Sequence, residues 1–248
     1  MRWPTFAPIT VSFNKEKLRD EIVSSQILTK GFVATSHLKD GKNFWDDNVH
    51  FQSPEFNKQK NIPLWRDESH QQLNDYTINT FKQVNLTTNS ANSLETVWEG
   101  RHDNKDKIPL WIKYDYPWHY RTDVNLPYFK QIVDSLGLEY FTMIRIVYQT
   151  PPSIGLIHKD SGPNTNLNYY ESGGIGITLN VSSGNGNLYF VDKQDQEQTL
   201  QEEVFDCWHF DDSVLHCTNE VSDLRLQIRI YGKHKEYQKL MDFSKAIY

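Results

Sequence analysis

Apolar and polar residues alternate in short segments through the C-terminal half of the chain, and turns rich in Gly and Asn separate these segments. Alternation with a period of two is typical of β-strands that bury one face, and tight turns between short strands are typical of antiparallel sheets. The pattern therefore predicts a mostly β fold, organised as an antiparallel sandwich or barrel. The predicted strands span residues 141–149, 153–158, 173–181, 187–191, 202–210 and 224–232.

Two segments of the N-terminal half carry clear helix signals. Asn14 can cap a helix that runs to about Leu28, because apolar residues recur there at helical spacing. The segment 126–136 has Pro127 in its first turn, apolar residues on one face and Gly137 at its end. Both segments are predicted to be helices that flank the β core.

The remaining segments have weaker patterns. A further helix is predicted at 68–83, a polar surface loop at 86–93, and a short amphipathic helix in the tail at 233–248. A chain of 248 residues can fold as one domain with a sizeable core. We expect a single domain in which residues 1–139 pack on and cover a β core formed by residues 140–232.

Composition narrows the possible partners. The formal net charge is −6 and the basic residues are scattered among acidic ones, so no surface for nucleic acid is expected. No apolar run approaches the length of a membrane span, and the first residues do not resemble a signal peptide. We therefore expect a cytoplasmic protein without membrane contact. Cys207 and Cys217 are interpreted as small buried thiols, and a bridge between them stays an open alternative.

The last predicted strand places polar side chains on one of its two faces. Arg225, Gln227 and Arg229 are two residues apart, so they share a face, and the aliphatic residues between them share the other. Buried guanidinium groups are costly unless they meet an anion. The row therefore indicates either a ligand that carries a carboxylate or a structural acidic partner.

A His-x-Asp motif and a distant histidine give the strongest chemical signal. His158 and Asp160 project from the same face at the end of a predicted strand, and His216 follows after the intervening strands. Two imidazoles and one carboxylate form the facial triad of non-haem Fe(II) oxygenases. A second motif, His209-Phe210-Asp211, is a weaker candidate because the series of strands that follows the first motif does not follow this one. Asp211 is expected to help build the turn before His216.

The order of these residues fits the needs of a particular cosubstrate. An oxygenase that uses 2-oxoglutarate needs two metal positions for the 2-oxo acid and one for O2. It also needs a fixed cation for the distal carboxylate, and the planar fork of Arg suits that group. Arg225 and Arg229 follow His216 by nine and thirteen residues, and both fit on spacing.

The region 140–232 resembles the Fe(II)/2-oxoglutarate-dependent dioxygenases, which have a double-stranded β-helix (jelly-roll, cupin-like) core. The best match is their aspartyl/asparaginyl β-hydroxylase-like branch, and the region is also similar to free-proline hydroxylases. Gly-Pro at 162–163 is a further similarity. The matching motif consists of Phe210, Asp211, Asp212, Ser213, His216, Asn219 and Arg225.

The resemblance implies a role for each candidate residue. Fe(II) would be bound by His158, Asp160 and His216, and the distal carboxylate of 2-oxoglutarate by Arg225. The spacing from His216 to Arg225 is one residue shorter than in the family, so Arg229 stays an alternative anchor. The family has another arginine on the middle strand, and this chain has no counterpart for it. Thr178 and Asn180 lie near that position and are the further candidates for binding the cosubstrate.

The resemblance implies a type of reaction but does not identify the substrate. The implied reaction hydroxylates an unactivated carbon and converts 2-oxoglutarate and O2 to succinate and CO2. The acidic net charge favours an amino-acid-like small molecule or a peptide side chain as substrate. A cupin-type protein that binds a metal or ligand without oxygenase activity is the alternative. The oligomeric state is left open.

Overall fold

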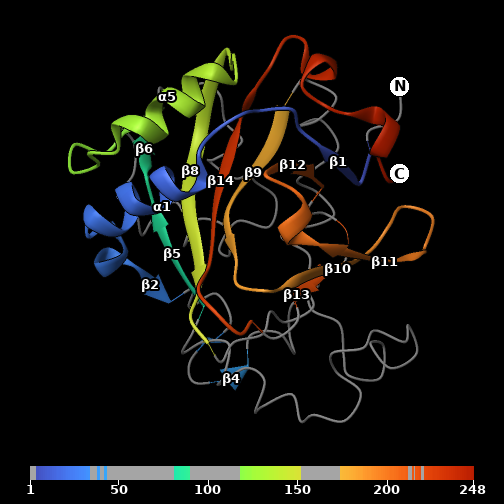
Figure 1. Cartoon of the computed structure of the whole chain (residues 1–248), viewed down its shortest axis with the longest axis horizontal. Coiled ribbons are helices and arrows are strands. Elements are labelled where there is room, and N and C mark those ends of the chain that lie inside the picture. The colour runs from blue at the N-terminus through green and yellow to red at the C-terminus, as the bar shows by residue number, and fades with distance from the viewer. Residues whose placement is uncertain are drawn as a thin grey trace.

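Two antiparallel β-sheets face each other in a computed structural model of the chain (Figure 1). The structure describes residues 4–33, 38–39, 42–43, 81–89, 118–151, 174–211, 214, 216–218 and 221–248. The larger sheet has seven strands in the order β1 (Phe6–Pro8), β12 (Cys207–Phe210), β9 (Gly174–Ser183), β14 (Arg225–Lys233), β8 (Tyr140–Gln149), β5 (Phe81–Asn85) and β2 (Phe32–Val33). The smaller sheet has the order β11 (Glu197–Gln201), β10 (Asn187–Val191) and β13 (His216–Thr218).

The order of the strands identifies the fold as a jelly roll. Successive strands cross between the sheets: β9 leads to β10 in the smaller sheet, β11 leads back to β12, and β13 leads back to β14. As a result β14 pairs with both β8 and β9, which precede it by many residues. This Greek-key order is that of the double-stranded β-helix, so the predicted fold class is confirmed.

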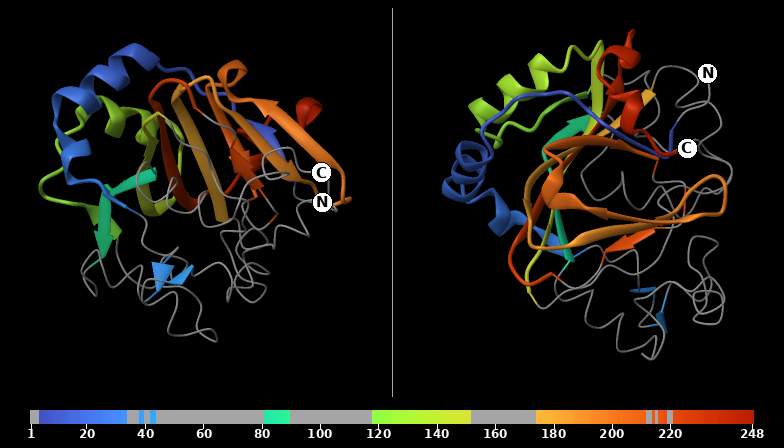
Figure 2. Two further views of the ribbon diagram at one scale, coloured as in Figure 1. Left: turned by 90° about the horizontal axis from the view of Figure 1, so that it is seen from below. Right: turned by 45° about the vertical axis from the view of Figure 1, so that its right-hand side comes forward.

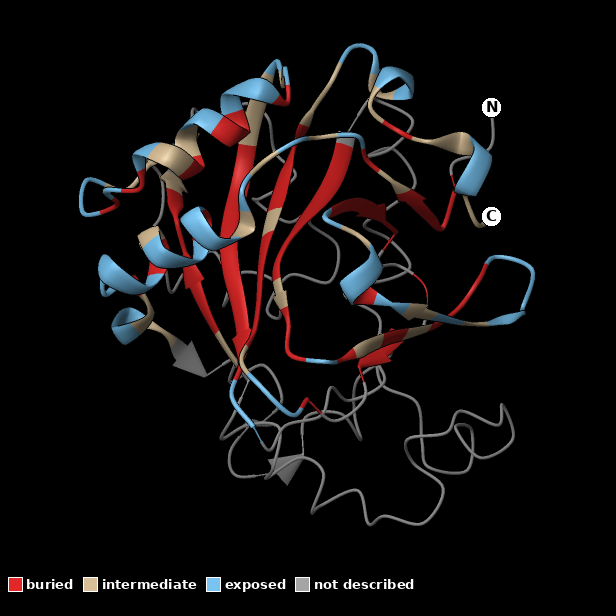
Figure 3. Cartoon of the chain, viewed as in Figure 1, coloured by how far each residue is buried: buried red, intermediate tan, exposed pale blue. Residues whose placement is uncertain are grey.

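Two helices cover one face of the larger sheet, α1 (Lys15–Ser24) and α5 (Pro127–Ser135) (Figure 2). The strand residues that pack with these helices are apolar, and all but one are aliphatic. Figure 3 shows that the strands are mostly buried. Burial of this apolar surface is the main favourable contribution to the stability of the layer. The residues of β8, β9 and β14 on this face are Ile144, Ile146, Tyr148, Ile175, Ile177, Leu179, Val181, Leu226, Ile228 and Ile230.

Capping explains where both helices begin. Asn14 accepts a hydrogen bond from the backbone N–H of Lys17, as the sequence predicts for a helix cap. The Glu21 carboxylate of α1 accepts two backbone hydrogen bonds at the start of α5, from Tyr128 at 2.7 Å and Phe129 at 2.9 Å. A carboxylate at a helix N-terminus also interacts favourably with the helix dipole. The two helices are therefore joined by charge as well as by packing.

Some sequence predictions differ from the structure. The predicted helix at 14–28 ends at Ser24, and a 3-10 turn, η1 (Ile27–Lys30), follows it. The predicted loop at 86–93 begins with a strand, β6 (Thr87–Asn89), which pairs with β7 (Trp118–Tyr120). The reason is that the Thr87 hydroxyl bridges to β8, donating to Thr142 O and accepting from Ile144 N.

Two other predicted helices differ from the structure where it describes them. The predicted helix at 68–83 ends in β5, and residues 68–80 lie outside the described residues. The tail at 233–248 contains two 3-10 turns, η7 (Tyr237–Lys239) and η8 (Phe243–Lys245), in place of a continuous helix. Ile247 exchanges backbone hydrogen bonds with Phe6, so the tail is fixed by the N-terminal strand. Along the described parts of the chain, no helix has both the length and the apolar character needed to cross a membrane.

Two short hairpin strands complete the described secondary structure, β3 (Leu38–Lys39) and β4 (Lys42–Asn43).

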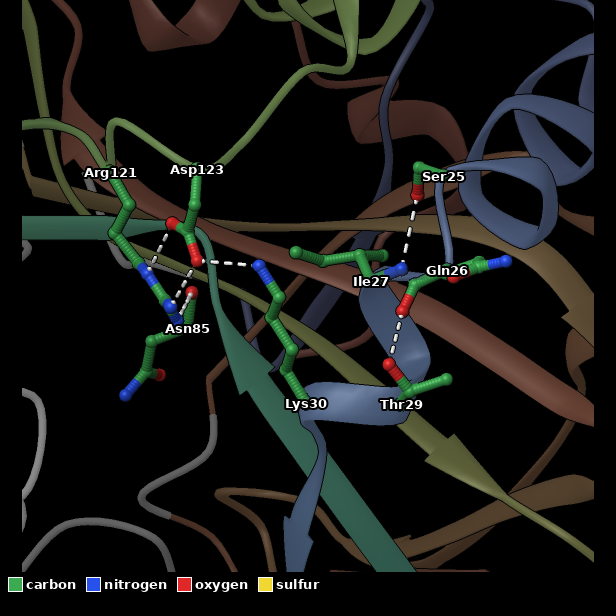
Figure 4. A network of polar contacts seen from close by, with 8 residues as sticks. All are labelled: Ser25, Gln26, Ile27, Thr29, Lys30, Asn85, Arg121 and Asp123. Atoms are coloured by element: carbon green, nitrogen blue, oxygen red, sulfur yellow. Dashed lines mark hydrogen bonds and ion pairs between the residues drawn. The ribbon is translucent and has the colours of Figure 1, made fainter.

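A network of charges ties the loop before α5 to the helical side of the sheet (Figure 4). Arg121 donates from Nε and Nη2 to the two carboxylate oxygens of Asp123, at 2.9 and 2.6 Å. Lys30 of η1 donates to the same carboxylate at 2.8 Å, and Arg121 also donates to the backbone oxygen of Asn85. The bond from Lys30, with support from Arg121, lowers the pKa of Asp123 below its usual value of 3.8.

The Asp123→Asn change is expected to lower the free energy of unfolding by at most about 1 kcal/mol at neutral pH, because the carboxylate is partly exposed. Because the folded-state pKa is lowered, the ionic contribution is present above the unfolded pKa and is lost as the pH falls through the folded value. The difference in melting temperature between the native chain and the variant should therefore shrink between about pH 5 and pH 3. A difference that stays constant over this range contradicts the assignment.

Candidate active site

The face of the larger sheet that points away from the helices is polar and buried. Alternation along each strand puts these side chains opposite the aliphatic ones that contact α1 and α5. So many polar groups can be buried only if they bond one another or a ligand. The buried polar residues of this face are Gln83, Asn85, Arg145, Gln149, Thr178, Asn180, Arg225 and Gln227.

Arg225 lies at the start of β14 and is only 3% exposed. Its Nε and Nη2 donate to the two carboxylate oxygens of Glu202, at 2.8 and 2.6 Å. Its Nη1 donates to Gln149 Oε1 and its Nη2 also donates to Gln227 Oε1, both at 2.8 Å. Of the two kinds of partner that the sequence allowed, the structure gives Arg225 a structural acid. Glu202 was missed because no sequence spacing links it to β14.

Glu202 belongs to the 3-10 turn η6 (Glu202–Val204), which Asn180 holds against β9. The Asn180 side-chain amide donates to the backbone oxygens of Glu202 at 2.7 Å and of Phe205 at 3.1 Å. Two of the predicted cosubstrate residues, Arg225 and Asn180, are thus engaged with the same turn.

Arg229 and Thr178 lie in a different place, around a small hollow between the sheets. Arg229 is in register with Thr178 of β9 on one side and with Arg145 of β8 on the other. Arg145 donates to Gln83 and lies 6.0 Å from the centroid of the Tyr231 ring. Four residues separate Arg229 from Arg225, which is ~13 Å along a strand. The hollow is lined by Gly176, Ile177, Thr178, Phe210, Arg229 and Tyr231.

His216 of β13 lies in the smaller sheet, on the face that packs against the larger sheet. It pairs with Phe190 of β10, whose side chain packs between the sheets, and it is 2% exposed. Its ring lies 5.1 Å from the ring of Phe210, at an interplanar angle of 78°. Phe210 is also one of the residues that line the hollow, so its ring contacts both His216 and the hollow where Arg229 and Thr178 lie.

A backbone carbonyl sets the orientation of the His216 ring. Nδ1 lies 2.9 Å from the backbone oxygen of Val214. A carbonyl can only accept, so Nδ1 carries the proton and donates it to this bond, and Nε2 then bears the lone pair. Metal-binding histidines are oriented in this way by a hydrogen bond from the second nitrogen. The arrangement therefore suits a metal ligand through Nε2.

The second His-x-Asp motif is used in packing. His209 is fully buried, its Nδ1 lies 2.9 Å from the backbone oxygen of Gly176, and burial lowers the pKa of His209 to about 4. Asp211 forms an ion pair with Lys193. Within the part of the chain that the structure describes, no three His, Cys, Asp or Glu side chains are placed to hold a metal. His158 and Asp160 lie outside the described residues, so the predicted triad stays a prediction.

The two cysteines form no disulfide with each other. Cys207 lies on β12 of the larger sheet and Cys217 on β13 of the smaller one, and both are buried. Burial raises the pKa of the Cys207 thiol well above its usual value. Cys207 is therefore a packed, unreactive thiol, as the sequence predicts. The alternative of a bridge between Cys207 and Cys217 is wrong.

No protein-family model matches the chain. No curated protein matches it either. Solved structures that are similar include a prolyl-4-hydroxylase from Pseudomonas putida, at 18% identity and a TM-score of 0.30 over 43% of this chain and 57% of that one. Another is SnoN, a non-heme alpha-ketoglutarate-dependent epimerase from nogalamycin biosynthesis, at 9% identity and a TM-score of 0.40 over 93% of this chain and 78% of that one.

A third similar structure is an oxidoreductase of the 2OG-Fe(II) oxygenase family from Burkholderia pseudomallei. It has 11% identity and a TM-score of 0.39, and the alignment covers 92% of this chain and 96% of that one. SnoN is also known in a structure with Fe3+ and alpha-ketoglutarate bound. The jelly-roll assignment itself rests on the strand order.

Proposed function

We propose that the chain is an Fe(II)- and 2-oxoglutarate-dependent dioxygenase of the aspartyl/asparaginyl β-hydroxylase-like kind. The observation that carries the proposal is the placement of His216. A buried imidazole, with Nδ1 held by a backbone carbonyl, packs against Phe210 inside a jelly roll, and Phe210 also lines a hollow that contains an arginine, Arg229. Each of these features has a role in an oxygenase that binds a 2-oxo acid.

The metal would be held by His216 together with His158 and Asp160. The donor chemistry fits, because two imidazoles and one carboxylate occupy one face of Fe(II) and leave three positions for ligands. The bound metal would supply the activation of O2 that hydroxylates an unactivated carbon. The ring of Phe210 packs against His216 and shields this side of the site from water.

Arg229 is the better candidate for the distal carboxylate of 2-oxoglutarate. Arg225 already makes four hydrogen bonds, two of them to a buried carboxylate, so a second carboxylate would have to displace Glu202. Arg229 lies beside the hollow that Phe210 shares with His216, and the Thr178 hydroxyl is next to it on β9. The sequence left both arginines open, and these contacts favour the alternative over the first choice.

The prime substrate is proposed from charge alone. The acidic chain offers no basic run for nucleic acid, so an amino-acid-like small molecule or a peptide side chain is the proposed substrate class. Hydroxylation of such a carbon would consume 2-oxoglutarate and O2 and release succinate and CO2.

The His216→Ala variant is expected to lose Fe(II) binding while it keeps its fold, because two remaining ligands compete poorly with water for the ion. Anaerobic titration with Fe(II) measures this loss, and His119→Ala is the matched control, since His119 is an exposed histidine on β7. The native chain with Fe(II) should also form succinate from 2-oxoglutarate. Unchanged Fe(II) affinity in the His216→Ala variant contradicts the metal site. Metal binding without succinate formation indicates a cupin-type binding protein.

A further inference from the structure

Strands β10 and β11 are joined by a hairpin (Figure 1). This hairpin contains Lys193, and the preceding residue, Asp192, closes the turn with its side chain. Asp192 Oδ1 accepts hydrogen bonds from the backbone N–H groups of Gln194 at 2.8 Å and Gln196 at 3.0 Å. Its Oδ2 accepts from Gln198 Nε2 at 2.9 Å. A turn closed by its own side chain in this way fixes the position from which Lys193 extends.

Lys193 extends from this turn to a buried carboxylate. Its Nζ lies 2.5 Å from Oδ2 of Asp211, whose side chain is 3% exposed, whereas that of Lys193 is 26% exposed. A buried carboxylate is costly without a cation, so the pair holds Asp211 in place. The backbone N–H of Asp211 is held as well, because it donates to Thr5 O at 2.9 Å.

A short series of contacts leads from Asp211 to the proposed metal ligand. The backbone oxygen of Asp211 accepts from the N–H of Val214 at 3.4 Å. The backbone oxygen of Val214 in turn accepts from Nδ1 of His216 at 2.9 Å. Phe210, which directly precedes Asp211, packs its ring against the same imidazole. The position of Asp211 therefore determines both contacts that orient the His216 ring.

We infer that Lys193 is a positioning residue for His216, acting through Asp211 and the Val214 carbonyl. The inference rests on the proposed metal site and adds to it the group that aims Nε2. If Asp211 moves, the Val214 carbonyl moves with it, and the imidazole can rotate away from the direction that a metal requires. Loss of an outer hydrogen-bonding partner typically lowers metal affinity about 10- to 100-fold.

The test uses Co(II) as the metal probe on the full chain. The Lys193→Met variant should bind Co(II) about tenfold or more weakly and show a changed visible spectrum of the bound ion. Lys193→Arg should restore both, because it keeps a cation within reach of Asp211. Lys30→Met is the matched control: it breaks the ion pair with Asp123 on the helical side of the sheet and should leave the affinity and the spectrum unchanged.

The Lys193→Met change leaves the buried Asp211 carboxylate without this cation. Asp211→Asn therefore serves as a second variant, because it removes the negative charge together with the ion pair. The same loss of Co(II) affinity is expected for it. A native spectrum and native affinity in either variant, measured below its melting temperature, overturn the positioning role. His216→Ala separates the two claims. If the His216→Ala variant binds Co(II) as the native chain does, the proposed metal site is wrong. If the His216→Ala variant loses Co(II) binding but the Lys193 and Asp211 variants do not, only the role of Lys193 is wrong.

Discussion

Replacing Glu202 by alanine is expected to lower the free energy of unfolding by about 3–5 kcal/mol. The carboxylate is 1% exposed and accepts two hydrogen bonds from Arg225, which is itself buried. Without it a guanidinium stays in the interior with only the side-chain oxygens of Gln149 and Gln227 as neutral acceptors. A buried charge that loses its partner is among the most destabilising single changes. Denaturant unfolding measures the effect.

Two further variants show whether the effect is that of the ion pair. Glu203→Ala changes the next residue of η6, which is exposed, and should alter stability by less than about 0.5 kcal/mol. The double change Arg225→Met with Glu202→Leu removes both charges and should recover most of the loss, because apolar residues of similar volume replace buried pairs well. If Glu202→Ala unfolds within about 1 kcal/mol of the native chain, the pair is not the anchor that its geometry indicates.

The sequence predicted those parts of the fold that depend on local rules. Alternation located β8, β9, β10 and β14, since a residue's position along a strand determines its face. The strand predicted at 202–210 is only partly correct, because its first residues form the turn η6 and only its end is the strand β12, and the strand predicted at 153–158 lies outside the described residues. The predicted turn at 182–187 is confirmed, because Gly184 and Asn185 both have positive φ, at 58° and 60°, as a tight hairpin of this type requires. Gly137 at the end of α5 likewise has φ of 65°.

The same rules failed where a contact joins distant elements. Periodicity places Arg225 on the interior face, but it does not show that Glu202, which precedes it by 23 residues, fills the space beside it. The strand β11 was missed because four of its five residues, Glu197–Gln201, are polar and three of the five are exposed, so no apolar alternation marks it. Strands such as these are defined by the neighbour with which they pair.

For the candidate site too, the sequence indicated individual residues but not the contacts between distant elements. The order of His216 and the arginines predicted a metal ligand and a cosubstrate anchor, and these roles stay predictions. The structure shows that His216 packs against Phe210 and that Phe210 and Arg229 line one hollow. The groups that orient the histidine, the Val214 carbonyl and the Lys193–Asp211 pair, follow from the path of the backbone. No motif encodes that path, so sequence reasoning could not supply them.

Replacing Arg229 by alanine is expected to weaken 2-oxoglutarate binding by about thirty-fold to several thousand-fold, which corresponds to the roughly 2–5 kcal/mol lost when one partner of a desolvated charge pair is removed. The physical reason is that Arg229 lines the hollow whose Phe210 packs against His216, whereas Arg225 is already paired with Glu202. Arg229→Lys should lie between, since it keeps the charge but loses the planar fork. Anaerobic calorimetric titration of the Fe(II)-loaded chain with 2-oxoglutarate measures these affinities.

The comparison with Arg225 decides which arginine is the anchor. A single change at Arg225 leaves Glu202 buried and unpaired, so its effect on binding would be confused with instability. The neutral double variant, Arg225→Met with Glu202→Leu, avoids this and should bind 2-oxoglutarate as the native chain does. If the double variant loses the cosubstrate and Arg229→Ala keeps it, then 2-oxoglutarate displaces Glu202 when it binds, and Arg225 is the anchor that the family spacing first indicated. If both variants keep it, both arginines are structural, and the cosubstrate carboxylate must be bound by residues beyond β14.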